Sequence, residues 1–173
     1  YVDYLSRVQH PKLRAGGTVQ LHATKGETSL EILVDSFGHV GFGQAKADRK
    51  GIVGTVQLDG RTLEGWEAVS LPLDDAWLAA LKPLGGKPSR PGVFFKGALS
   101  LAQTGDCYLD MADWAKGYLW VNGRLLGRYW NIGPQQRVYC PAPWLRAGDN
   151  EVLVFDMHRT EPAAIRCAAS FQA

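Results

Sequence analysis

The strongest structural signal in this chain is the stretch GYLWVNGRLLGRY at residues 117–129. Apolar segments lie on both sides of Asn122-Gly123, a dipeptide typical of two-residue β-hairpin turns because both of its residues tolerate positive φ. The stretch therefore predicts two antiparallel strands joined by a type I′ turn. Alternation along the first strand places Trp120 in the core. The second strand carries the further motif residues Gly127 and Tyr129.

Short strand signals separated by turn residues continue on both sides of this hairpin. They predict further strands at residues 93–101, 106–111, 137–140, 151–156 and 165–171, with residues 147–150 as a turn. Many short strands with turn signals every ~8–12 residues are typical of a sandwich or jelly roll.

The first half of the chain is also rich in strand signals. Strands are predicted at residues 18–23, 28–34 and 52–58, the last closed by the turn dipeptide Asp59-Gly60. One helix is predicted at residues 76–81, capped by Asp74 or Asp75 and stopped by Pro83 and by the glycines that follow.

These patterns predict an all-β chain, an antiparallel β-sandwich or jelly roll preceded by part of a second β-domain, with one short helix. We assign residues 1–66 to the partial first β-domain, residues 67–91 to a linker with the short helix, and residues 92–173 to the jelly-roll domain. The opening residues, YVDYL, look like the middle of a folded segment and favour a start inside a larger protein.

Composition argues against several classes of partner. The net charge is only +2 and the basic residues are scattered, which disfavours nucleic acid and anionic membranes. No apolar run approaches the ~18–20 residues that span a bilayer, and no signal peptide opens the chain.

The three cysteines do not form a metal-binding pattern. Cys107, Cys140 and Cys167 show no CxxC spacing and no nearby histidine at ligand spacing, so we expect no metal and no cofactor. Cys107 and Cys140 lie in apolar strand patterns, which favours buried free thiols. A disulfide between these two remains an alternative.

No catalytic motif stands out. The acidic residues lie mostly at turns or on polar strand faces, and neither a GxSxG elbow nor a phosphate-binding glycine pattern is present. Glycoside hydrolysis usually needs two convergent carboxyl groups, and the sequence pairs none.

Aromatic residues are dense between residues 107 and 144, and one loop there combines them with polar side chains. A sugar site needs an aromatic platform with hydrogen-bonding groups beside it. The loop after the hairpin offers Trp130 as an exposed platform, with Arg128, Asn131 and Gln135 as hydrogen-bond partners. The structural alternative is that Arg128 stacks on an aromatic ring and that at most one of Tyr129 and Trp130 points inward.

Two long segments resemble a known family. DMADWAKGYLWVNGRLLGRYW at 110–130, with GPQ at 133–135 and YCP at 139–141, resembles the C-terminal galactose-binding-like domain of family 35 β-galactosidases. LEILVDSFGHVGFG at 30–43, with KGIVG at 50–54, resembles the β-domain that precedes it.

The resemblance implies a parent enzyme that removes terminal β-linked galactose with retention, using two glutamates of a (β/α)₈ barrel that this chain does not match. It implies that the chain packs around that barrel as a non-catalytic region. The alternatives are an autonomous carbohydrate-binding module for galactose-containing saccharides, or an enzyme in its own right.

Overall fold

The computed structural model describes residues 18–21, 25–26, 29–35, 43, 51–83 and 85–171. The chain forms two compact units, residues 2–71 and residues 72–173. The domain boundaries assigned from the sequence, including the linker at 67–91, stay a prediction.

The described part of the first unit contains one small antiparallel pair. Strands β1 (Gln57–Leu58) and β2 (Arg61–Thr62) flank the predicted turn, in which Asp59 and Gly60 have φ of 47° and 78°. The predicted strand at 52–58 is therefore confirmed only at its end.

The other two strands predicted for the first unit are not seen where the structure describes them. Residues 18–21 and 29–35 form no strand, which corrects that prediction for these residues. Large apolar side chains there are exposed, for example Leu21 at 50% and Val34 at 49%. A strand needs a partner for its backbone groups, and the described residues provide none at these segments.

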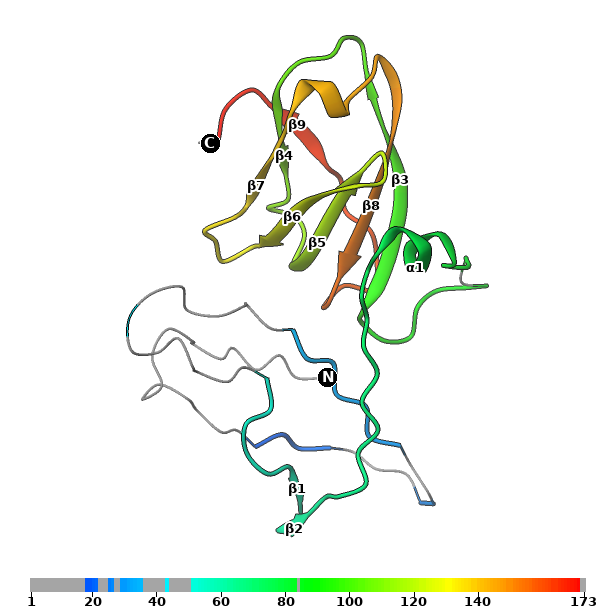
Figure 1. Ribbon diagram of the computed structural model, residues 1–173, viewed down its shortest axis with the longest axis vertical. Coiled ribbons are helices and arrows are strands. Elements are labelled where there is room, and N and C mark those ends of the chain that lie inside the picture. Colours follow the sequence, from blue (N-terminus) through cyan, green and yellow to red (C-terminus); the bar gives the residue numbers. More distant parts are fainter. Residues whose placement is uncertain are drawn as a thin grey trace. The chain divides into compact units, whose positions relative to one another are not determined.

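The second unit is a two-sheet antiparallel sandwich, as predicted (Figure 1). One sheet has the order β3-β8-β5-β6, with bounds Val93–Leu101, Gly148–Asp156, Lys116–Val121 and Arg124–Trp130. The other sheet has the order β7-β4-β9, with bounds Arg137–Cys140, Cys107–Asp110 and Arg166–Ala168. Neighbouring strands in both sheets are antiparallel.

The central hairpin of β5 and β6 has the expected turn. Asn122 and Gly123 take φ of 49° and 77°, as a type I′ turn requires. A register shift between Leu119 and Trp120 adds one residue on the β6 side, so Tyr118 lies opposite Arg128. This bulge sets which side chains share a face farther along the hairpin.

Strand β8 begins earlier than predicted, because Asp149 and Asn150 belong to the strand and not to a turn. The buried Asn150 side chain donates to the carbonyls of Leu99, Arg146 and Gly148 and accepts from the Arg146 N–H. A polar residue can be buried in this inner strand because its side-chain groups find backbone partners.

The short helices fit their local sequences. Helix α1 (Asp75–Ala79) ends two residues before the predicted end, and Asp74 is its N-cap, accepting from the Trp77 N–H at 2.8 Å. A 3₁₀ helix, η3 (Ala142–Trp144), follows Pro141 and was not predicted.

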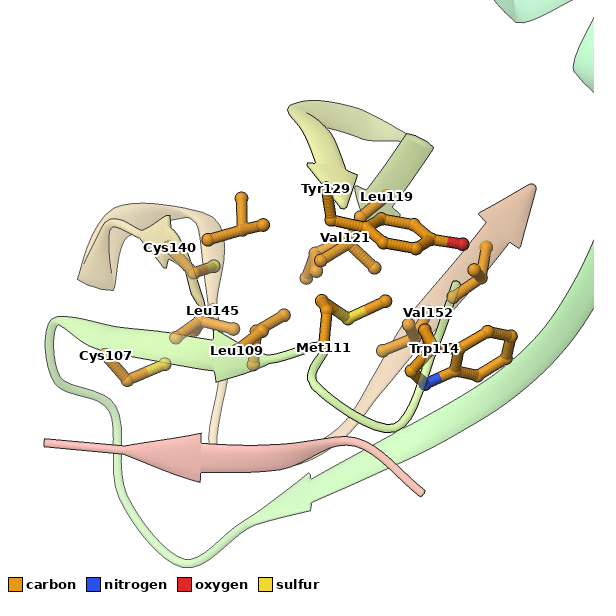
Figure 2. Packing of buried hydrophobic residues seen from close by; sticks show 12 residues of the cluster. Cys107, Leu109, Met111, Trp114, Leu119, Val121, Tyr129, Cys140, Leu145 and Val152 are labelled. Carbon is orange, nitrogen blue, oxygen red and sulfur yellow. The ribbon is translucent and has the colours of Figure 1, made fainter. Parts of the chain in front are cut away.

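The main hydrophobic core lies between the two sheets (Figure 2). Leu109 of β4 packs with Leu119 and Val121 of β5, and all three side chains are fully buried. Met111 and Trp114 come from the segment between these strands and close the same cluster.

A second cluster covers the outer face of the four-stranded sheet. Trp120, Phe155 and Met157 are buried there, and Leu73 and Leu78 of the α1 region pack against them. Trp120 is 3% exposed, so its ring is a core group of this outer layer.

Candidate ligand-binding loop

The loop at residues 130–136 is held in place by its own backbone. The Trp130 N–H donates to the Gln135 carbonyl at 3.0 Å, and the Gly133 N–H donates to the Trp130 carbonyl at 2.9 Å. The Gln136 side-chain amide donates to the Asn131 carbonyl. These bonds fix the two ends of the loop against each other. The loop geometry is thus pre-organised.

A further hydrogen bond ties the loop to the segment before β5. The Asn131 N–H donates to the Ala115 carbonyl at 2.8 Å, and the Ala115 N–H donates to the Asp156 carboxylate at 3.0 Å. Asp156 is fully buried and also accepts from the Tyr129 hydroxyl at 2.8 Å and from the N–H groups of His158 and Arg159. The loop is therefore anchored through one backbone unit to a buried carboxylate.

Tyr129, which precedes the loop in sequence, is a core residue. Its side chain is fully buried, and its hydroxyl contacts the Phe155 carbonyl as well as Asp156. Burial and the neighbouring Asp156 carboxylate raise the pKa of Tyr129 well above its usual range. The phenol therefore stays a hydrogen-bond donor to that carboxylate.

Trp130 is half-buried at the end of β6, which differs from the exposed platform predicted from the sequence. The ammonium of the buried Lys116 lies 4.9 Å from the centre of its ring. Lys116 and Trp130 are directly paired in the β5–β6 ladder, and the buried lysine thus gains a cation–π partner.

Arg128 points along the same sheet face toward a neighbouring tyrosine. Its guanidinium donates to the Tyr118 hydroxyl at 2.6 Å and lies 5.2 Å from the Tyr118 ring centre. This contact matches the structural alternative given above, in which Arg128 stacks on an aromatic ring. The structure places Arg128 and Trp130 on one face, since they are two residues apart on one strand.

Asn131 and Gln135, the other two predicted partners, are exposed. Their backbones meet near Trp130, since the Trp130 N–H donates to the Gln135 carbonyl. Their assignment to a ligand site remains a proposal.

An aromatic row on this face was not predicted from the sequence. Phe94 of β3 stacks on Phe155 of β8 with ring centres 4.6 Å apart, and Phe155 lies opposite Tyr118 in the ladder. Tyr118 in turn lies 6.2 Å from Trp120. Spacing along a single strand cannot reveal this row because it runs across three strands, β3, β8 and β5.

A groove lies elsewhere on that sheet. It has a volume of about 1240 Å³ and is bordered by α1, the 88–94 segment, the Asn122-Gly123 turn and Leu153. None of Arg128, Trp130, Asn131 or Gln135 lines it. A smaller cavity of about 340 Å³ lies in the first unit beside Trp66.

The described residues show no metal-binding cluster of three or more His, Cys, Asp or Glu side chains. In the same residues, no helix has both the length and the apolar character needed to cross a bilayer.

Family models match most of the chain in two parts. Residues 2–72 match the first all-β domain of β-galactosidase, and residues 92–150 match the galactose-binding domain of β-galactosidase. The second match contains the hairpin, Arg128, Trp130 and the loop that follows.

Full-length relatives match across both parts. The human β-galactosidase-1-like protein 2 is 39% identical over 145 residues, which is 80% of this chain and 23% of the relative. A β-galactosidase of Xanthomonas manihotis is 37% identical over 123 residues, covering 70% of this chain and 20% of the relative. β-Galactosidase 1 of Dictyostelium discoideum is 36% identical over 149 residues. The chain thus spans less than a quarter of the length of these relatives.

Proposed function

Because this chain belongs to the β-galactosidase family and carries two of its all-β domains, we propose that it is the non-catalytic region that supports a catalytic (β/α)₈ barrel. The observation that carries this proposal is the order of the two domain matches, which together extend from residue 2 to residue 150. The parent activity we propose is the release of terminal β-linked galactose.

The contacts of the carboxylates support a structural role. Asp156 is fully buried and receives four hydrogen bonds, so its oxygens are already satisfied within the fold. Other carboxylates pair with basic side chains, namely Asp110 with Arg137, Asp113 with Arg166, Glu151 with Lys96 and Glu161 with Lys87. A glycosidase instead needs one carboxyl group free to protonate the leaving oxygen and a second one across the scissile bond.

Hydrolysis of a chromogenic β-galactoside by the isolated chain tests the non-catalytic part of the proposal. We expect no turnover above the substrate blank, while the Xanthomonas manihotis β-galactosidase serves as the active control. Turnover that follows the chain through purification, and that disappears when one carboxylate is changed, would contradict the proposal.

A second candidate function is the binding of galactose-containing saccharides at the 128–135 loop. It is favoured by the half-buried Trp130 ring at a strand end, next to the exposed Asn131 and Gln135. Because the loop is held by backbone bonds at both ends, a sugar would meet little ordering cost there. Arg128 would act at this site through its fixed position on Tyr118.

Calorimetry with lactose tests this second function. We expect weak binding, with Trp130→Ala lowering the affinity at least tenfold and Trp66→Ala, an exposed tryptophan of the other unit, leaving it unchanged. Trp130→Ala should also cost about 1–2 kcal/mol of stability, since it removes the ring that faces the Lys116 ammonium. Absence of binding by a folded chain excludes this function and leaves the supporting role intact.

A further inference from the structure

The three cysteines of the chain converge on one face of the sheet β7-β4-β9. Cys107 of β4 lies directly opposite Cys140 of β7. On the other side of β4, Leu109 is paired with Cys167 of β9. Since residues two apart on a strand share a face, Cys107 lies diagonal to Cys167 on the same side of the sheet.

The sulfur atoms distinguish two of these thiols from the third. The Sγ atoms of Cys107 and Cys167 are 3.2 Å apart, in direct contact. Cys140 is fully buried and Cys107 is nearly so, with 8% exposed, whereas Cys167 is exposed. Of the three, Cys167 is therefore the exposed residue, and its sulfur is in contact with that of Cys107.

We propose that Cys167 and Cys107 form an oxidisable dithiol, which a small-molecule disulfide converts into an intramolecular bond between β9 and β4. The Cys167 thiolate attacks one sulfur of the external disulfide and expels the first small thiol. The Cys107 sulfur then loses its proton, attacks the Cys167 sulfur and expels the second. Two protein thiols are oxidised and one external disulfide is reduced to two thiols.

The environment of the thiols sets the order of these steps. Burial and contact with Cys167 raise the pKa of Cys107 to about 12, and burial raises that of Cys140 to about 11. Because the thiolate is the nucleophile, both buried thiols are poor first attackers at neutral pH. The exposed Cys167 begins the exchange, and Cys107, already in contact with it, resolves the mixed disulfide.

The bond would act on the least supported strand of its sheet. β9 has three residues and pairs only with β4. Outside the ladder, Arg166 forms an exposed ion pair with Asp113 at 3.1 Å. Beyond the end of β9, the Ser170 carbonyl accepts from Arg137 at 3.1 Å. A covalent link from Cys167 to Cys107 closes a long loop of chain, which limits the unfolded state.

Oxidised glutathione is the probe that tests this proposal on the full chain. After incubation, alkylation and proteolysis, we expect a peptide pair joined through Cys107 and Cys167, and a urea midpoint above that of the reduced protein which dithiothreitol reverses. Cys140→Ser should form the same bond. Cys167→Ser, an exposed and conservative change, should form none.

Other linkages overturn the proposal. These are a bond that includes Cys140, a Cys167–glutathione adduct that persists at pH 9, or three cysteines that all remain alkylatable in the folded protein. A circular dichroism spectrum of Cys167→Ser that matches the parent shows that the missing bond is not due to misfolding.

Discussion

At the scale of single residues, position 117 has room only for glycine, which the neighbouring sequence does not reveal. A Cβ built on Gly117 would lie 1.7 Å from the Phe155 carbonyl oxygen and 2.9 Å from the Tyr129 hydroxyl. The close contact is with the backbone of β8, which pairs with β5 on this side. A side chain here therefore separates two central strands.

We predict that Gly117→Ala destabilises the fold by about 3 kcal/mol or more, through overpacking of the sheet. Gly97→Ala is the matched control, because Gly97 also pairs with β8 and its Cβ would meet no atom within 4 Å. Urea unfolding of the two variants measures the difference. Equal stability of the two would contradict the close approach at Gly117.

The Asp110 carboxylate makes the stability of the fold depend on pH. The Ala112 N–H and the Arg137 guanidinium lower the pKa of Asp110 below its usual value, and Arg137 donates at 3.1 Å. A group with a lowered folded pKa contributes stability above its unfolded pKa, and this contribution disappears as the pH falls through the folded pKa.

We therefore predict that Asp110→Asn lowers the free energy of unfolding at pH 7, and that its deficit shrinks below about pH 4, the ordinary range of a carboxyl group. Urea unfolding of both proteins between pH 2.5 and 7 checks this. A deficit that stays constant down to the lowest pH would show that Asp110 acts through its shape and not through its charge.

At the scale of elements, the hairpin shows what local sequence can and cannot predict. Asn122-Gly123 predicts the turn because its φ requirement is local. A two-residue turn without a bulge would place Tyr118 opposite Gly127, but the extra residue places it opposite Arg128. Gly127, with φ of 145°, lies beside that irregularity. The sequence does not state where the bulge falls, so the Arg128 partner was not predicted.

The order of the strands within the sheets also cannot be predicted from local sequence patterns. Strand periodicity predicted most strands of the second unit, but the pairing of β8 between β3 and β5 depends on side chains that are distant in sequence. Asn150 looks like a turn residue by composition, and only the carbonyls of other segments explain its burial. In the candidate loop, the residue type alone suggested Trp130 as a site residue. The contact of Lys116 with the Trp130 ring depends on the register of the β5–β6 ladder, which local sequence does not show.

The turn itself provides a direct test at this scale. Gly123→Val puts a β-branched side chain at φ of 77°, which we expect to cost about 1–3 kcal/mol. Gly105→Val is the control, since Gly105 lies outside the strands and its φ is not in the positive region. Unfolding midpoints in urea compare the two. If both variants lost the same amount of stability, the loss would come from the valine side chain itself and not from the conformation of the turn.

At the scale of the whole molecule, the role that we propose is that of a region that supports a catalytic barrel. The second unit has its own core between two sheets, and the domain matches continue into the first unit. The described apolar side chains of the first unit are largely exposed, among them Leu30, Ile32 and Val53. Burial of such side chains against another part of a protein would be favourable. This agrees with the proposal that the chain packs against a larger catalytic part.

The most direct test of this claim is association in trans with the missing part of a relative. The Xanthomonas manihotis β-galactosidase is produced without the segment that this chain matches, and its size-exclusion profile and chromogenic activity are measured with and without added chain. We predict co-elution of the two proteins and a rise in activity or heat resistance that Gly117→Ala, a fold-breaking variant, does not give. Separate elution, with activity unaffected by the folded chain, would contradict the proposal that this chain supports a catalytic barrel.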